Sequence, residues 1–297
     1  QVIEIIAEGK TVTYKVTIPE GLTSEQIIDR LKADSNLSGE IADLPAEGSL
    51  LPETFIVQRG ASRQSILDKM LGESRKLSEK MRDQRKKDLP LKTWEEAVIL
   101  ASIVEKETGR NDERERVAAV FINRLKQKMR LQSDPTIVYG ISGGKAVWNR
   151  PILRSEIAQK TAHNTYQIDG LPPTPICNPG KAAIEAVLNP ADTKDLYFVA
   201  DGSGGHVFSE TLKDHNASVQ KWRAVEKEIR AKTVAAPPPG DTPTTGQPKT
   251  RAVVRTPPEK GKAPQPGAGQ QGSTPGQDNK GWSSTTQQPA QPQPKAK

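Results

Sequence analysis

Residues 93–109, TWEEAVILASIVEKETG, carry the clearest helix pattern in the chain. The hydroxyl of Thr93 can cap the helix, and Glu96 stands three residues later, where it completes a capping box. Apolar residues then fill one side of the segment, and Gly109 follows its end, as is usual just beyond a helix C-terminus. A well-buried helix over residues 94–107 is therefore predicted.

Two carboxylates stand at the end of this helix. The apolar stripe centres near Ala97 and Val104, so Glu107 lies about 70° from that centre and Glu105 about 90° away on the opposite side. The terminal position slightly favours Glu107, because a side chain there can face a cleft while apolar surroundings raise its pKa, as a general acid requires. On this local evidence alone, the plainer interpretation is that both are solvated residues.

Helices and strands follow one another in mixed order around this segment, which predicts an α+β fold. Residues 11–18 alternate apolar and polar side chains and predict a half-buried strand, and Thr23 with Gln26 predicts a second capped helix. Segments rich in Gly and Pro, residues 132–151 and 163–180, are predicted as loops. Further helices are predicted over residues 62–87, 112–128, 181–188 and 212–231, and further strands over residues 196–200 and 206–208.

The composition divides the chain into four parts. Residues 1–45 are predicted to form a small α/β subdomain, residues 46–90 a connecting region with a charged helix, and residues 91–232 the larger domain. Residues 233–297 hold 13 of the 24 prolines and very few large apolar side chains, which predicts a disordered Pro/Gln-rich tail. That tail holds eight Lys/Arg against three Asp/Glu, so most of the net charge of +7 lies outside a folded surface and no nucleic-acid partner is expected.

The cysteine and histidine pattern argues against a metal or redox site. Cys177 is the single cysteine, which excludes an intrachain disulfide and a thiolate zinc cluster. His163, His206 and His215 lack the HxxxH and HExxH spacings, so neither a metal nor a cofactor is expected.

The N-terminal sequence suggests that the chain begins inside an element. The strand-like run at residues 2–6 opens it without an initiator Met, and no stretch approaches the ~20 apolar residues of a membrane span. We therefore expect any membrane anchor to lie upstream of this sequence.

Polar side chains gather in the segments that follow the long helix. Amides, hydroxyls and one aromatic suit a neutral, polyhydroxylated ligand such as a sugar, although the same residue types are also common turn formers. The candidates for binding are Gln132, Ser133, Asp134, Asn164, Tyr166 and Asn178.

Five stretches, taken together, resemble the MltG (YceG-like) family of endolytic murein transglycosylases. They run in the family's order over about 170 residues: EGSLLPETF (47–55), ILASIVEKET (99–108), ERERVAAVFINRLKQKMRLQSDPTIVYG (113–140), NTYQIDGLPPTPICNPG (164–180) and LYFVADGSGGHVFSETLKDHN (196–216). The resemblance implies a LysM-like small domain, here truncated, and a single-pass anchor in the bacterial inner membrane that holds this portion in the periplasm. It also implies that the second glutamate of EKET, Glu107, is catalytic, with Glu105 as the neighbour to be ruled out.

The implied reaction cuts the bond between N-acetylmuramic acid and N-acetylglucosamine inside peptidoglycan glycan strands and leaves 1,6-anhydro ends, which would end the growth of nascent strands. Glu107 would act first as acid and then as base, and peptidoglycan synthases are expected partners. Asp134 is the one nearby acid for a second-carboxylate role, although its place before Pro135 is more typical of a turn or cap.

Two other functions compete with this one. A non-catalytic peptidoglycan-binding or scaffold protein of the cell-wall synthesis machinery would also use a LysM-like unit. An aminodeoxychorismate lyase would need a Schiff-base lysine and a phosphate cup. Lys106 is expected to point outward, and the glycine-rich turn after Asp201 does not open a helix, so the lyase is disfavoured.

Overall fold

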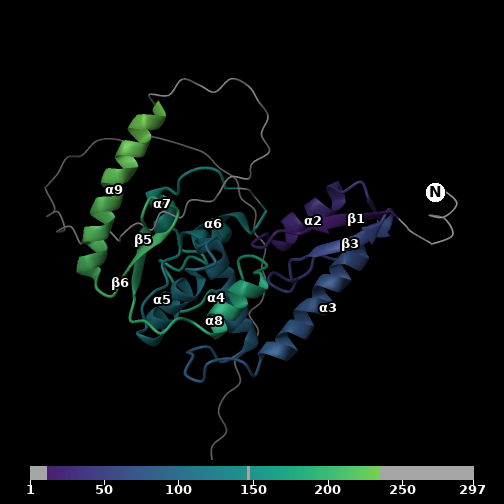
Figure 1. Cartoon of the computed structure of the whole chain (residues 1–297), viewed down its shortest axis with the longest axis horizontal. Helices are drawn as coiled ribbons and strands as arrows, with labels where there is room; N and C mark the ends of the chain where they lie inside the picture. The colour runs from purple at the N-terminus through teal and green to yellow at the C-terminus, as the bar shows by residue number, and fades with distance from the viewer. Residues whose placement is uncertain (1–11, 146–147, 235–297) are drawn as a thin grey trace, which may run out of the picture. The chain divides into compact units, whose positions relative to one another are not determined.

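The computed structural model describes residues 12–145 and 148–234, and Figure 1 shows the arrangement of its elements. Helices mix with small two-stranded sheets, so the predicted α+β class is confirmed. The run at residues 2–6 and the predicted tail from residue 235 onward lie outside the described residues. In chain order the elements are β1 (Thr13–Thr17), α2 (Ser24–Ala33), β2 (Leu37–Ser38), β3 (Thr54–Gln58), β4 (Ala61–Ser62), α3 (Arg63–Met81), α4 (Trp94–Glu107), α5 (Arg114–Lys126), α6 (Asp134–Ser142), α7 (Arg154–Ala158), α8 (Lys181–Leu188), β5 (Tyr197–Ala200), β6 (His206–Ser209) and α9 (Leu212–Val234).

The N-terminal part is built on an antiparallel pair of strands, β1 and β3, in which Thr13 lies opposite Gln58 and Thr17 opposite Thr54. The helix α2 begins with the predicted capping box. Val12, expected on the apolar face of the strand, is 72% exposed because it precedes the first paired residue.

One apolar cluster fills this part. Its buried members come from β1, α2, β3, α3 and the chain between them: Val16, Ile18, Ile27, Leu31, Leu37, Leu50, Val57, Ile66, Leu67 and Met70. The cluster and the β1–β3 pair both cross residue 45, where the sequence predicts a boundary. The packing therefore joins the small subdomain to the start of the connecting region, and the division at residue 45 stays a prediction.

The larger core lies around α4, which packs against both α5 and α8. The residues of α4 match the predicted helix from end to end, and Thr93 Oγ1 accepts a hydrogen bond from the Glu96 amide as expected. The second bond of the predicted capping box, from the Thr93 amide to the Glu96 carboxylate, is replaced by a bond from the Lys92 amide to that carboxylate. The antiparallel β5–β6 hairpin is covered by α9.

The prediction of one continuous loop over residues 132–151 was wrong, because α6 occupies residues 134–142. Pro135 lies in the first turn of α6, where its missing amide hydrogen is not needed, and Gly143 ends the helix with φ +59°. A short helix, α7, also follows soon after. Gly and Pro therefore mark the boundaries of these helices. The segment at residues 163–180 does lack helix and strand, as predicted.

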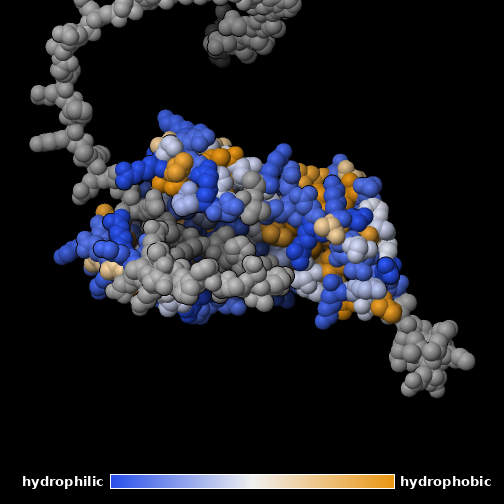
Figure 2. Space-filling model, turned by 90° about the horizontal axis from the view of Figure 1, so that it is seen from above, coloured by the Kyte–Doolittle hydropathy of each residue, from blue (hydrophilic) through white to orange (hydrophobic). Residues whose placement is uncertain are grey.

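On the face that Figure 2 shows, hydrophilic residues predominate and apolar patches lie among them. Among the described residues of the N-terminal part, the large exposed apolar ones are Val12, Leu44 and Ile56. Over residues 12–145 and 148–234, no helix combines the length and the apolar character that crossing a membrane requires.

Candidate active site

Glu107 ends α4 with its side chain inside the protein, only 5% exposed. The Ser133 hydroxyl donates a hydrogen bond of 2.6 Å to its Oε1 atom. Its Oε2 atom is buried and has no hydrogen-bond partner within the described parts of the chain. A buried charged oxygen without a partner is costly, whereas a protonated carboxyl avoids most of that cost. The geometry thus favours a Glu107 that carries a proton.

The groups around Glu107 set its pKa. Burial raises the pKa of the Glu107 carboxyl to about 7, while the hydrogen bond from Ser133 acts in the opposite direction. The negative charge of Asp134 raises this pKa further, and the positive charge of Arg124 lowers it. A carboxyl with a pKa near neutrality can both give and take a proton at physiological pH.

Glu105, the second carboxylate of the same turn, is bound elsewhere. Its Oε2 atom accepts a hydrogen bond of 3.0 Å from the amide of Gly180, the residue that caps the N-terminus of α8. Desolvation by burial raises the pKa of Glu105 as well. Its carboxylate therefore fastens α8 to α4, and of the two glutamates Glu107 is the one with a buried oxygen that has no partner in the described parts of the chain. The lysine between them does not point outward as expected, because Lys106 Nζ donates to the Gly21 carbonyl.

The turn before α6 delivers Ser133 to Glu107. Gln132 has φ +52°, a left-handed conformation that is strained for a residue with a side chain. Thr165 holds the turn, because its carbonyl accepts from the Gln132 amide (3.2 Å) and its hydroxyl accepts from the Ser133 amide (2.9 Å). The hydroxyl of Thr136 completes the cluster at 2.9 Å from that of Thr165. Strain that is held in place by several bonds is typical of a functional site.

Asp134 and Tyr166 form a second pair beside Glu107. The Tyr166 hydroxyl donates a bond of 2.7 Å to Asp134 Oδ1, and burial together with Asp134 raises the pKa of this tyrosine. Asp134 is the first residue of α6, where the helix dipole favours a carboxylate. The structure thus brings three of the predicted site residues, Ser133, Asp134 and Tyr166, together around Glu107, with Gln132 in the adjoining turn.

Asn164 binds the end of α7 and the loop that follows it. Its amide nitrogen donates to the carbonyls of Glu156, Ile157 and Gln159, and its oxygen accepts from the Tyr166 amide. The side chain is 1% exposed. These contacts place Asn164 as a brace for the segment that carries Tyr166.

Asn178 links separate parts of the chain. Its amide nitrogen donates to the Leu22 carbonyl, the Ser24 hydroxyl and the Glu47 carboxylate, and its oxygen accepts from the Leu50 amide. The side chain is fully buried. All of these bonds join the N-terminal part to the loop before α8.

Three further residues surround the site that were not among the predicted site residues: Arg124, Thr136 and Thr165. Arg124 on α5 is 4% exposed, and its charge acts on Glu107. A sign of its burial is present in the sequence, since it lies three residues after Phe121 and seven after Val117, on the apolar face of the helix. For Thr136 and Thr165 the sequence contains no comparable sign of burial.

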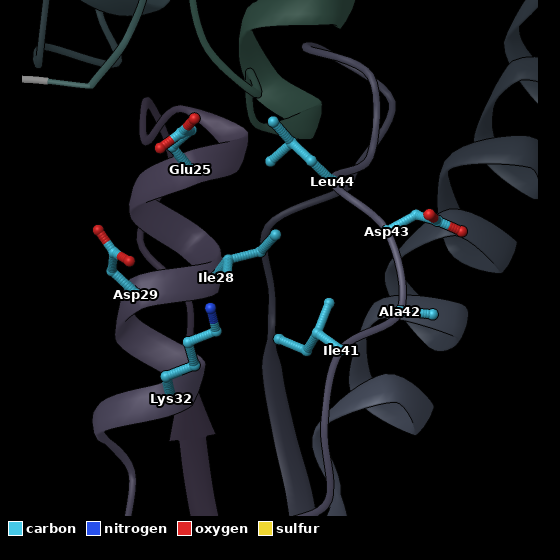
Figure 3. A pocket seen from close by; sticks show the side chains of 8 residues that line it. All are labelled: Glu25, Ile28, Asp29, Lys32, Ile41, Ala42, Asp43 and Leu44. Carbon is cyan, nitrogen blue, oxygen red and sulfur yellow. The ribbon is translucent and has the colours of Figure 1, made fainter.

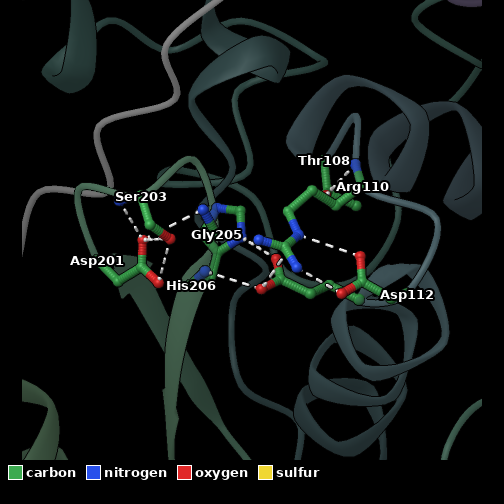
Figure 4. A network of polar contacts seen from close by, with 8 residues as sticks. Thr108, Arg110, Asp112, Asp201, Ser203, Gly205 and His206 are labelled. Atoms are coloured by element: carbon green, nitrogen blue, oxygen red, sulfur yellow. Dashed lines mark hydrogen bonds and ion pairs between the residues drawn. The ribbon is translucent and has the colours of Figure 1, made fainter.

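A polar network braces the chain just beyond Glu107, as Figure 4 shows. Glu113 accepts from the His206 amide (3.0 Å) and pairs with His206 Nδ1 (2.8 Å), while Arg110 binds Asp112. A Cβ atom on Gly205 would come within 2.7 Å of the Glu113 carboxylate, which would have to shift to admit a side chain there. The network fastens this hairpin to the start of α5.

The three histidines lie in separate contacts. His163 bonds to Thr174, His206 pairs with Glu113, and His215 stacks on Tyr197. Within the part of the chain that the structure describes, no three His, Cys, Asp or Glu side chains come together as a metal site would require.

A shallow hollow lies elsewhere, between α2 and residues 41–44 of the N-terminal part. Figure 3 shows the side chains of Ile28, Ile41 and Leu44 pointing into it, with Lys32 at its lower end. None of the predicted site residues lines it.

Comparison with known proteins gives consistent matches. The sequence model of the YceG-like family matches residues 1–221. An endolytic murein transglycosylase of Bacillus subtilis is 31% identical over 235 residues, which cover 77% of this chain and 63% of that protein. One of Streptococcus pneumoniae is 32% identical over 222 residues, which cover 67% of this chain and 39% of that protein. The chain thus spans less than two thirds of the length of either relative. A crystal structure of a YceG-like protein from Listeria monocytogenes aligns with a TM-score of 0.56 at 30% identity, covering 73% of this chain and 80% of that one.

Proposed function

This chain belongs to the YceG-like family, and from that premise we propose that it is an endolytic murein transglycosylase with Glu107 as its acid and base. The proposed substrate is the bond between N-acetylmuramic acid and N-acetylglucosamine inside a glycan strand. The relatives from Bacillus and Streptococcus support the class of reaction. The observation that carries the proposal for this chain is the buried, unpartnered Oε2 atom of Glu107.

One carboxyl is enough for this reaction because the substrate supplies the nucleophile. Protonated Glu107 gives its proton to the glycosidic oxygen, the bond from C1 of the muramic acid to that oxygen breaks, and the N-acetylglucosamine side leaves with a hydroxyl. The Glu107 carboxylate then takes the proton of the C6 hydroxyl, whose oxygen bonds to C1 and closes the 1,6-anhydro ring. Water is not consumed, whereas ordinary glycosidases need a second carboxylate for a nucleophile or a water.

The neighbours of Glu107 take supporting roles in this scheme. Ser133 holds Oε1, which leaves Oε2 for the sugar oxygen, and it stabilises the carboxylate between the two proton transfers. Asp134 is held by Tyr166 and favours the protonated state of Glu107 through its charge. Gln132, next to Ser133, is the strongest candidate for a direct sugar contact. For Asn164 and Asn178 the bonds favour a role in holding the loops.

The N-terminal part is proposed to be a truncated LysM-like unit. Its antiparallel β1–β3 pair, with α2 between the two strands in the chain, supports this assignment. We further propose that the protein works in the periplasm, tethered to the inner membrane by a segment upstream of this sequence, beside peptidoglycan synthases whose nascent strands it cuts. The support for this location is the proposed substrate, which lies outside that membrane.

Incubation with purified sacculi tests the proposed function. The wild-type chain should release soluble glycan fragments whose ends are 1,6-anhydro by mass spectrometry, and Glu107→Gln should release none while keeping its circular-dichroism spectrum. Glu105→Gln is the matched control, because an amide oxygen can still accept from Gly180, and it should keep the activity. Anhydro ends in similar amounts from Glu107→Gln would overturn the assignment of Glu107. A wild-type chain that sediments with intact sacculi and releases nothing would overturn the reaction.

A further inference from the structure

Arg124 is a buried cation whose hydrogen bonds go to backbone carbonyls. Its Nε atom donates to the Leu196 carbonyl (2.7 Å) and its Nη1 atom to the Leu131 carbonyl (2.6 Å). Its guanidinium carbon lies 5.4 Å from the centre of the Tyr197 ring. The side chain thus connects α5 to the start of β5 and to the segment before α6.

Burial of this guanidinium has a cost, which is visible as a lowered pKa caused by desolvation. A buried ionic group is often replaceable by an apolar side chain without loss of stability. An arginine at an apolar position of α5 therefore calls for a reason beyond packing. Its position relative to Glu107 provides one.

The Leu131 carbonyl, which accepts from Arg124, lies directly before the strained residue Gln132. Arg124 holds the turn on that side, and Thr165 holds Gln132 and Ser133 on the other side. The left-handed conformation of Gln132 is fixed between these two anchors, and the Ser133 hydroxyl meets Glu107 as a result. If the Arg124 bond is lost, the turn can relax and Ser133 moves away from the carboxyl.

The polar and charged groups around Glu107 come from three parts of the chain. Ser133 and Asp134 belong to the start of α6, Tyr166 to the loop before α8, and Arg124 to α5. Of these four, Arg124 alone is positive, and Asp134 adds a negative charge. The Glu107 carboxylate that forms after the first proton transfer therefore has Arg124 as its one nearby counter-charge in this set.

We propose that Arg124 is a positioning residue of the site: it fixes the Leu131–Ser133 turn against Glu107, and its buried charge balances the carboxylate that forms during each catalytic cycle. The inference rests on the proposed function and assigns a further residue to it. Arg124 touches neither the sugar nor the transferred proton. Arg124 acts by holding the turn that carries Ser133 and by the electrostatic effect of its positive charge on Glu107.

Two substitutions separate the two roles. Arg124→Gln removes the charge, whereas Arg124→Lys keeps it. Each offers one nitrogen where Arg124 uses two, so both variants weaken the bridge between the two carbonyls. Arg116→Gln is the matched control, because Arg116 also lies on α5, binds Asp195 at 2.6 Å and stacks on Phe208. Each variant is measured for kcat/KM on glycan strands across pH, for thermal unfolding, and for titration of the Glu107 carboxyl by carbon-13 NMR.

For Arg124→Gln we expect kcat/KM to fall about 10²-fold, the cost typical of a misplaced catalytic group. Without the positive charge the Glu107 pKa rises, so the alkaline limb of the pH–rate profile should move up by about one pH unit. Arg124→Lys should lower kcat/KM but keep the alkaline limb at the wild-type pH. Arg116→Gln should change neither kcat/KM nor the position of the limb.

Two results would overturn the inference. The first is a folded, active Arg124→Gln variant in which the alkaline limb and the Glu107 titration match those of the wild type. The second is an Arg124→Lys variant with the kcat/KM of the wild type. The second result remains decisive if Arg124→Gln does not fold. If the wild type makes no anhydro ends, the proposed function fails, but the Glu107 titration in the two Arg124 variants still tests the electrostatic part by itself.

Discussion

The behaviour of Glu107 depends on a few contacts within hydrogen-bond reach of one carboxyl. Desolvation is the largest influence on its pKa, and the single bond from Ser133 reverses only part of it. The sequence could place Glu107 at the border of an apolar stripe but could not separate it from Glu105. That separation depends on which distant loop packs against each carboxyl, and helix periodicity does not contain this information.

Glu107→Gln should change how stability depends on pH. The folded state holds the Glu107 proton with a pKa of about 7, against 4.5 for the unfolded chain. This contribution is therefore complete below pH 4.5 and is lost as the pH rises through 7. Relative to Glu107→Gln, the free energy of unfolding of the wild type should fall by roughly 3 kcal/mol across that window. Urea unfolding of both proteins at several pH values checks this, and parallel curves would contradict it.

Ser133→Ala should leave the carboxylate form of Glu107 without its hydrogen bond. The charged form is then less stable, so the Glu107 pKa rises and the alkaline limb of the pH–rate profile should move up by about one pH unit. Ser142→Ala, at the other end of α6, removes a hydroxyl that accepts from the Gly144 amide and serves as the control. A limb that stays in place in Ser133→Ala would show that this bond does not tune the acid.

Among the elements, α4 was predictable and α6 was not. The ends of α4 depend on local signals, a capping threonine and a long apolar run, and both signals act in the folded chain. Pro135 and Gly143 are residue types that are common in loops, yet they lie at the start and end of α6. The turn of the candidate site lies just before this missed helix, so its geometry could not be predicted from the sequence.

Gln132→Gly tests the strained turn. Glycine adopts φ near +52° without steric cost, so the folded state should gain up to about 1 kcal/mol, partly offset by the greater freedom of the unfolded chain. If the Gln132 side chain contacts the sugar, KM should rise at the same time. Lys128→Gly, at φ +56° beyond α5, is the control and should leave KM unchanged. An unchanged KM in Gln132→Gly would exclude the sugar contact.

At the scale of the folded unit, two apolar clusters meet through polar contacts. Asn178 and Glu47 bind each other at 2.9 Å, and Glu47 also accepts from the Ser24 amide at the start of α2. Gly48 fits beside them without a side chain, since a Cβ atom there would come within 2.5 Å of Pro175. From the sequence, Asn178 was a candidate for binding sugar, because an asparagine in a loop can bind a ligand or hold the loop in place. Only the fold shows where its bonds go.

Asn178→Ala should destabilise the protein by about 3 kcal/mol, because it leaves the buried Leu50 amide without its acceptor and removes one of the donors to Glu47. KM for glycan strands should stay close to that of the wild type. Asn36→Ala is the control, since Asn36 makes its side-chain bond locally to Asp34. Normal stability with a raised KM would instead support the substrate-binding role predicted from the sequence.

The most direct measurement is the titration of Glu107 itself in the wild-type chain, followed by carbon-13 NMR of its carboxyl and assigned by the signal that disappears in Glu107→Gln. We expect a midpoint near pH 7, with the proton retained well above the range of an exposed glutamate. A midpoint near 4.5 would mean that this side chain is already ionised at neutral pH. It would then have no proton to give to the glycosidic oxygen, and the proposed mechanism would be wrong.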